Sequence, residues 1–135
     1  MPEAGGYVLR ITTPEWVRQV FDTLTYCTNL SRRWEPGQTI LFVHKTHAGE
    51  AVVGFGIVEA IREKDELSED ERGVCEKGGW KKAILFKYVK EFGQPLLIKK
   101  TCLKDLNLHG KYFHGLKVTQ KQTGSIVAQG ENSQG

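Results

Sequence analysis

Apolar positions recur at two different periods along this chain, and the changes of period divide it into expected strands and helices. Residues 7–11, YVLRI, form a short apolar run that predicts a first strand. Thr13 can then cap a helix, with Pro14 at its first position and Glu15 in its first turn. The apolar face of this helix is expected at Trp16, Val17, Val20, Phe21 and Leu24. Residues 26–33 are polar, small and basic, and they predict a loop.

The stretch from Trp34 to Ile61 predicts a central hairpin around which the other elements are arranged. Residues 35–38, EPGQ, form a turn, and residues 39–45, TILFVHK, are rich in strand-forming residues and too short for a helix. A hairpin tip at 46–49 leads into a longer strand over 50–62. Strict alternation places Val53, Phe55, Ile57 and Ile61 on one face, and Val52, Gly54, Gly56 and Val58 on the other. Since both faces are apolar, this strand is expected in a closed or doubly covered sheet.

The C-terminal half continues with further strands and a final helix. Residues 64–79 are charged and predict a short helix with a surface loop, whereas 80–92 and 95–101 predict two separate strands. Residues 102–108 predict a turn or a short helix, and Thr119 can cap a last helix that extends through Val127. The chain is expected to form a single domain over residues 1–129, with a flexible polar tail at 130–135.

Composition narrows the functional classes but does not select one. The net charge of +3 permits nucleic-acid binding without requiring it. The cysteines, Cys27, Cys75 and Cys102, are odd in number and widely spaced, which favours isolated reduced thiols over a zinc site or a disulfide framework. No secretory signal is evident, and a cytoplasmic location is predicted. No nucleotide-binding loop, dinucleotide-binding glycine motif or zinc-protease motif is present, so no cofactor or metal is predicted.

Several short motifs together resemble the PUA-like superfamily, which includes the PUA, ASCH, YTH and EVE domains. They are the turn WEPGQ at 34–38, the strand ILFVH at 40–44, VGFGIV at 53–58, PLLI at 95–98, KDL at 104–106 and KYFHG at 111–115. The resemblance covers nearly the whole chain and points to a mainly archaeal PUA-like family. It implies an α+β fold: a small, mostly antiparallel, twisted PUA-like β-barrel with flanking helices.

The chain departs from these relatives at three places. Gln38 stands where they usually carry aspartate, and Tyr26 is the nearest aromatic residue to the tryptophan that EVE and YTH members place after the first helix. The Gly-x-Lys-x-x-Glu loop of ASCH members is missing.

The resemblance also implies a nucleobase cleft, where bases stack on flat side chains and form hydrogen bonds through their edges. Mapped onto this chain, the cleft is lined by Thr12, Tyr26, Thr28, Asn29, Ser31 and His44. Trp34 and Tyr88 are predicted to be partly exposed stacking surfaces, because polar and basic residues flank them. Gly54 and Gly56 either let a ligand approach closely or relieve strand curvature.

Cationic side chains are expected to form a basic rim for phosphates, since backbone contacts dominate nucleic-acid affinity. The candidates are Arg32, Arg33, Lys45, Lys81, Lys82, Lys87, Lys99, Lys100 and Lys111. Acidic residues nearly balance these charges, so a solvated surface of mixed charge is the alternative interpretation.

The sequence therefore predicts a domain that binds RNA or a modified base, and two other interpretations stay open. One is a small metal-independent ribonuclease in which His44 and His114 act as acid and base. The other is a protein-interaction or ligand-sensing domain that binds no nucleic acid. No membrane partner is predicted, because no apolar run approaches the length of a bilayer span.

Overall fold

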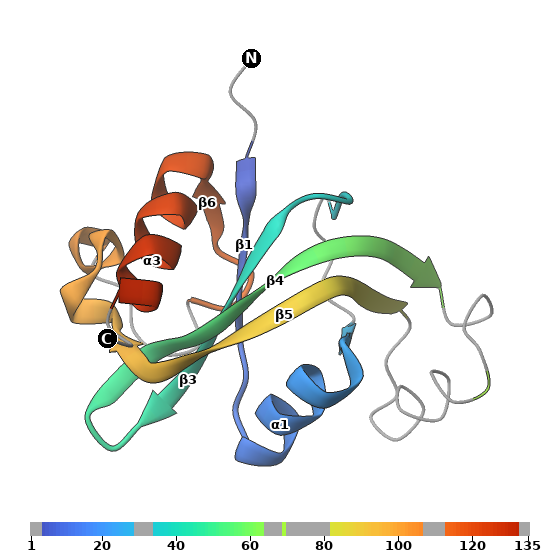
Figure 1. Ribbon diagram of the computed structural model, residues 1–135, viewed down its shortest axis with the longest axis horizontal. Helices are drawn as coiled ribbons and strands as arrows, with labels where there is room; N and C mark the ends of the chain where they lie inside the picture. The colour runs from blue at the N-terminus through green and yellow to red at the C-terminus, as the bar shows by residue number, and fades with distance from the viewer. Residues whose placement is uncertain (1–3, 29–33, 64–68, 70–81, 107–112, 133–135) are drawn as a thin grey trace.

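The computed structural model describes residues 4–28, 34–63, 69, 82–106 and 113–132 (Figure 1). The elements in chain order are β1 (Ala4–Arg10), α1 (Pro14–Thr23), β2 (Thr25–Thr28), β3 (Thr39–Thr46), β4 (Gly49–Glu63), β5 (Lys82–Leu97), the short 3-10 helices η2 (Ile98–Lys100) and η3 (Cys102–Leu106), β6 (Lys117–Thr119) and α3 (Gln120–Asn132). None of the helices in these ranges is long and apolar enough to cross a membrane.

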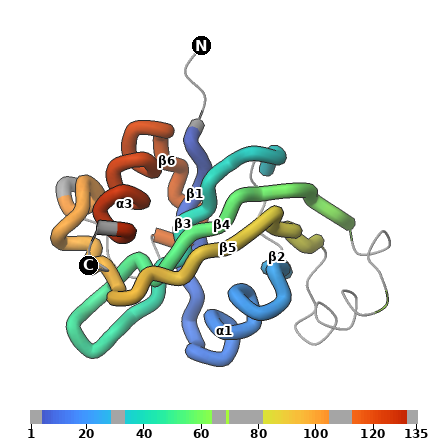
Figure 2. The backbone as a smooth tube through the Cα atoms, viewed as in Figure 1, coloured from blue at the N-terminus to red at the C-terminus, as the bar shows by residue number. Residues whose placement is uncertain are grey.

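The strands form one six-stranded mixed sheet in the order β2-β5-β4-β3-β1-β6. Only the β1–β3 pair is parallel among these neighbours, so the predicted mostly antiparallel α+β fold is confirmed. The expected closure into a barrel is wrong for the described strands, because β2 and β6 lie at opposite edges of the sheet. These edge strands have four and three residues, whereas β4 and β5 have 15 and 16. The two edge strands do not pair with each other, and the sheet stays open (Figure 2).

The two long helices cover opposite faces of this sheet (Figure 1). Alternation along β1 and β3 sends Val8 and Leu41 into the core under α3, which includes Ile126. Leu9 and Phe42 point the other way, into the core under α1, which includes Val20. Both faces of the central strands are thus apolar and covered, as the sequence predicted for residues 50–62.

Both predicted helix starts are confirmed by side-chain capping. The backbone N–H of Trp16 donates to Thr13 Oγ1 at 3.2 Å, and α1 begins at Pro14. At the start of α3, the N–H of Gln122 donates to Thr119 Oγ1, while the N–H of Thr119 donates to Gln122 Oε1. This reciprocal pair satisfies two backbone donors at once.

Helix α3 continues to Asn132, beyond the predicted end at Val127 and the predicted tail boundary at residue 129. The added residues make two contacts with β5. Lys90 of β5 pairs with Glu131 at 3.3 Å. The buried Gly130 lies against the ring of Phe92, where any side chain would collide with it.

The glycines of β4 serve packing between elements. A Cβ at Gly54 would meet the carbonyl oxygen of Lys90 and lie 2.7 Å from Phe21 Cζ of α1. A Cβ at Gly56 would lie 2.8 Å from Phe86 Cδ1 and 2.9 Å from Val89 Cγ1. The space over both glycines is therefore filled by protein, and the suggested approach of a ligand at these positions is wrong.

The predicted alternation along β4 is also wrong at Val52, Val53 and Ile61, because the strand contains bulges. Val53 and Ile61 belong to the core under α1, whereas Phe55 and Ile57 belong to the core under α3. The β3–β4 register shifts between Phe42 and Val43, and the β4–β5 register shifts twice near Val58. Each extra residue reverses the face that later side chains occupy.

Two segments form strands where the sequence predicted a break. Residues 26–28 were expected in a loop, yet they belong to β2 and pair with β5 (Figure 2). The two strands expected at 80–92 and 95–101 form one strand, β5, that ends at Leu97 and is followed by η2. Pro95 is accommodated because a bulge in β5 removes it from the ladder. The short helix predicted from residue 102 is confirmed as η3, whereas the prediction for 64–79 lies outside the described residues except for Glu69.

The expectation of isolated thiols is wrong for Cys27, which is buried and disulfide-bonded. Cys102 is a free, exposed thiol. Cys75 lies outside the described residues.

Candidate nucleic-acid interface

A small cavity lies where β1 ends, α1 begins and β2 leaves the helix. Its volume is about 100 Å³, and it is lined by Arg10, Ile11, Thr12, Trp16, Tyr26 and Cys27. The chain brings these residues together because Leu24 adopts a left-handed conformation that ends α1 and turns the chain directly into β2. Two predicted cleft residues, Thr12 and Tyr26, therefore meet at one site.

Tyr26 is a lining residue of this cavity whose pKa is shifted by its own burial. Burial raises the pKa of its hydroxyl from 10.0 to about 12. The hydroxyl therefore stays neutral well into the alkaline range, and a neutral tyrosine hydroxyl can donate a hydrogen bond.

The raised pKa of Tyr26 predicts a specific loss of stability in alkali. The unfolded chain releases this proton near pH 10 and the folded chain near pH 12, so the stabilisation is complete below pH 10 and is lost as the pH rises through about 12. We expect Tyr26→Phe to remove up to roughly 3 kcal/mol of this pH dependence. Denaturant unfolding at a series of alkaline pH values measures it. Tyr88→Phe, at an exposed position, is the control and should keep the wild-type profile, and an unchanged profile for Tyr26→Phe would contradict the prediction.

A larger cavity of about 400 Å³ lies on the other side of the α1 N-terminus. It is lined by Pro14, Val17, Arg18, His44, Thr46, Val53, Glu91, Phe92, Gly93 and Pro95. His44, which the sequence assigned to the same cleft as Thr12 and Tyr26, lines this cavity instead. Of the predicted cleft residues, Thr12 and Tyr26 line one cavity and His44 lines another.

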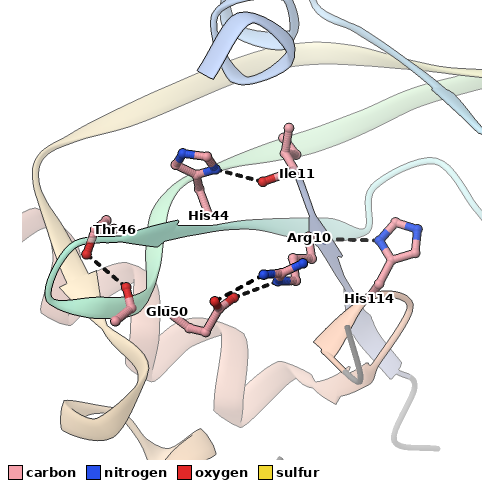
Figure 3. Close-up of polar contacts among 7 residues, drawn as sticks. Arg10, Ile11, His44, Thr46, Glu50 and His114 are labelled. Atoms are coloured by element: carbon pink, nitrogen blue, oxygen red, sulfur yellow. Dashed lines mark hydrogen bonds and ion pairs between the residues drawn. The ribbon is translucent and has the colours of Figure 1, made fainter. Parts of the chain in front are cut away.

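A hydrogen bond fixes the orientation of the His44 ring. Its Nδ1 lies 2.7 Å from the carbonyl oxygen of Ile11 (Figure 3). Because a carbonyl oxygen only accepts, Nδ1 is the donor, and in the neutral ring Nε2 is left as an acceptor. Figure 3 shows Nε2 pointing away from Ile11.

The two histidines of the ribonuclease hypothesis do not face each other. His114 Nδ1 accepts from the backbone N–H of Arg10 at 3.1 Å, on the β6 side of β1. His44 contacts Ile11 from the β3 side, and Figure 3 shows the two rings on opposite sides of β1. This geometry does not bring an acid and a base to one reacting group. Within the described ranges, no three His, Cys, Asp or Glu side chains are grouped to hold a metal ion.

Arg10 is a residue of the smaller cavity that the sequence analysis did not identify. Its Nε lies 2.7 Å from Glu50 Oε1 and its Nη2 lies 3.2 Å from Glu50 Oε2, so the guanidinium reaches across β3 to β4 (Figure 3). The hydrogen bond to Glu50 is the main reason that the pKa of Arg10 is raised above its ordinary value. The only sequence signal was a charged residue at the end of an apolar strand.

The other predicted contacts are dispersed over the molecule. Thr28 is buried in β2, and the ring of Trp34 packs edge-on against Tyr7 at a centroid distance of 4.9 Å. Lys45 is exposed on β3. Tyr88 is 48% exposed on β5, as predicted, and lies far along the sheet from His44 in the β4–β5 register.

The remaining candidates are on several elements or outside the described residues. Lys87 is exposed on β5, and Lys99 and Lys100 are exposed on η2. The predicted contacts and rim residues outside the described ranges are Asn29, Ser31, Arg32, Arg33, Lys81 and Lys111. The basic rim therefore stays a prediction.

Comparison with known proteins adds a structural likeness. No protein-family model and no curated protein sequence matches the chain. The crystal structure of the ASCH protein from Zymomonas mobilis is similar with a TM-score of 0.62, at 16% identity over 90% of this chain and 92% of that chain. Its serine-to-alanine variant gives 0.64, at 18% identity over 96% and 99%. Its tyrosine-to-phenylalanine variant gives 0.62, at 17% identity over 90% and 95%. At these identities the likeness shows the fold alone: the predicted PUA-like architecture is confirmed as similar to that of these ASCH structures, and an archaeal placement is not supported.

Proposed function

We propose, from the ASCH-type fold as premise, that this chain binds RNA and that the smaller cavity contacts an unpaired or modified base. The observation that carries the proposal is the convergence of Thr12, Trp16 and Tyr26 at the β1–α1 junction. Two of these residues, Thr12 and Tyr26, are among those that the PUA-like resemblance predicts in the cleft.

The chemistry of this cavity suits the edge of a base. Trp16 and Tyr26 contribute aromatic surface, and base–aromatic contacts are worth about 1–3 kcal/mol each. The neutral Tyr26 hydroxyl and the exposed Thr12 can form hydrogen bonds with polar groups on the base edge. A volume of about 100 Å³ holds part of one base, so the rest of the nucleotide would lie on the surface.

The proposed phosphate contacts are the cations that follow β2 in the chain. Arg32 and Arg33 come directly after the strand that carries Tyr26, and we propose that they contact the backbone together with Lys45 and Lys111. Such contacts position a strand without reading its sequence, and they make affinity depend on salt.

A charge placed at the mouth of the cavity tests the proposal. We expect Thr12→Glu to weaken binding of labelled single-stranded RNA at least tenfold, because the new carboxylate would repel phosphate groups. Fluorescence anisotropy at low and moderate salt measures the dissociation constant. Ser125→Glu is the matched control, since it adds the same charge at an exposed position on α3, across the sheet from α1.

Three outcomes would contradict the proposal. They are failure of the wild-type chain to bind any RNA pool in low salt, equal weakening by both variants, and binding that is confined to single-stranded DNA. Gel analysis of the recovered RNA addresses the ribonuclease alternative, because cleavage that is lost in His44→Ala or His114→Ala would favour that function instead.

A further inference from the structure

The larger cavity owes its existence to two register shifts that occur at the same place in the sheet. On the β3 side, Phe42 pairs with Gly54 and Val43 pairs with Val52, so Val53 is an extra residue. On the β5 side, Gly54 pairs with Glu91 and Val52 pairs with Leu96, so Phe92–Pro95 leave the ladder. Val53, Phe92, Gly93 and Pro95 all line the cavity. Bulges of this kind commonly redirect side chains and backbone beside binding sites.

The lining has an apolar floor and a polar mouth. Val53 and Phe92 are buried, and the partly buried Val17 of α1 forms a wall. Pro14, Arg18, Glu91, Gly93 and Pro95 are exposed around the opening. A cavity of about 400 Å³ with mostly apolar walls and a few placed polar groups has the size and character of small-molecule sites.

The charged groups at the mouth neutralise each other. Arg18 Nη2 lies 3.0 Å from Glu91 Oε1, and Arg18 Nε lies 3.7 Å from Asp22 Oδ1. The guanidinium also lies 5.6 Å from the centroid of the Phe21 ring. An anionic ligand would have to compete with two carboxylates for this cation, so a neutral ligand is favoured.

Few polar groups of the lining are available to form hydrogen bonds with a ligand. The Thr46 hydroxyl donates to the carbonyl oxygen of Gly49 at 2.8 Å and accepts from the N–H of Ala48, so it is used within the hairpin. His44 has Nδ1 committed to Ile11, and no described residue is hydrogen-bonded to its Nε2. Nε2 can accept from a ligand N–H, and Gly93, which lies outside the β4–β5 ladder, also lines the cavity.

We infer that the larger cavity is a second ligand site, distinct from the proposed RNA contact, and that it takes a neutral, planar heterocycle of nucleoside size. Val17 and Phe92 are apolar residues of the lining against which a flat ring can pack. His44 Nε2 accepts one hydrogen bond from a ring or exocyclic N–H. The site requires no RNA, so it can be tested independently of the proposed function.

The experiment titrates the full chain at neutral pH with adenosine, guanosine, cytidine and uridine, and follows backbone amide shifts by NMR. We expect at least one nucleoside to give saturable shifts at Val17, Val53 and Gly93. Uracil and its 6-carboxylate, orotate, form a matched pair that tests the charge preference. We expect orotate to bind more weakly than uracil, and tighter binding of orotate would overturn the assignment of a neutral ligand.

Two variants and one control locate the site. In His44→Asn the side-chain amide can keep the donor to Ile11 but lacks Nε2, and we expect at least tenfold weaker binding. Val17→Phe should fill the cavity and weaken binding by a similar factor. His114→Asn should bind as the wild type does, because His114 lies across β1 from this cavity.

Melting temperatures of all three variants separate lost binding from lost folding. If both cavity variants remain folded and bind nucleosides like the wild type, the assignment of the site is overturned. Absence of saturable shifts for every nucleoside at millimolar concentration overturns the inference altogether.

Discussion

Replacing Gly54 with alanine should destabilise the fold by about 3 kcal/mol, although the substitution adds a single methyl group. The new Cβ would collide with the backbone carbonyl of Lys90 in β5 and lie 2.7 Å from the Phe21 ring of α1. The carbonyl belongs to the β4–β5 ladder, so it can move only by breaking strand pairing. Denaturant unfolding monitored by circular dichroism measures the change in the free energy of unfolding.

Gly124→Ala is the matched control for this substitution. Gly124 lies within α3, and a Cβ there would meet no atom within 4 Å. Alanine should therefore stabilise the helix by up to about 1 kcal/mol, because glycine is disfavoured in helix interiors. The glycine-to-alanine substitution is thus expected to lower the free energy of unfolding at position 54 and to raise it at position 124. A Gly54→Ala variant as stable as the wild type would contradict the close packing of α1 on β4.

The second large effect is expected at Glu50, the partner of Arg10. Glu50→Gln should lower the free energy of unfolding by about 2 kcal/mol, because hydrogen bonds to charged groups contribute roughly 1.5–3 kcal/mol. The Arg10 and Glu50 side chains are only 18% and 15% exposed, so the guanidinium loses its carboxylate partner where water replaces it poorly. Thermal and denaturant unfolding of the purified variant measure the loss.

The exposed Arg18–Glu91 pair provides an internal control with the same chemistry. Its side chains are 54% and 48% exposed, and Glu91→Gln should change stability by less than about 1 kcal/mol. If Glu50→Gln and Glu91→Gln lowered the free energy of unfolding equally, burial would not strengthen the Arg10–Glu50 pair. The double variant Arg10→Met/Glu50→Leu should be more stable than Glu50→Gln, since it leaves no unpaired charge.

Local chemistry was enough to predict the elements whose boundaries depend on nearby residues. Thr13 and Thr119 cap α1 and α3 because a hydroxyl and a backbone N–H a few residues apart satisfy each other without help from the rest of the chain. The β3–β4 hairpin was predicted from its turn residues and its apolar run. The mostly antiparallel architecture followed from these elements and from the PUA-like resemblance.

The predictions were wrong where contacts between segments far apart in the sequence determine the local structure. Tyr26 and Thr28 form a strand because β5 offers them a pairing edge, which their own polarity does not indicate. Pro95 interrupts the strand pattern in sequence, yet β5 absorbs it in a bulge. The curvature expected of a closed barrel was attributed to glycines that instead make room for Phe21 and Phe86.

The candidate site was predicted in part for the same reason. Thr12 and Tyr26 meet because only α1 separates them along the chain. His44 was assigned to their cleft, but it lines the larger cavity, with its ring hydrogen-bonded to the carbonyl oxygen of Ile11. The larger cavity could not be predicted, because it depends on two register shifts that coincide only after β3, β4 and β5 have paired.

The position of β1 between β3 and β6 has a consequence for the order of folding. β1 pairs in parallel with β3 and antiparallel with β6, and β6 comes from the opposite end of the described sequence. During synthesis, one edge of β1 can pair as soon as the hairpin has formed, while its other edge stays open until Lys117–Thr119 have left the ribosome. Contacts between such distant segments slow folding, and an open strand edge invites pairing with other chains. The last strand of the sheet is only three residues long, yet it covers a β1 edge that would otherwise be open to pairing with another chain.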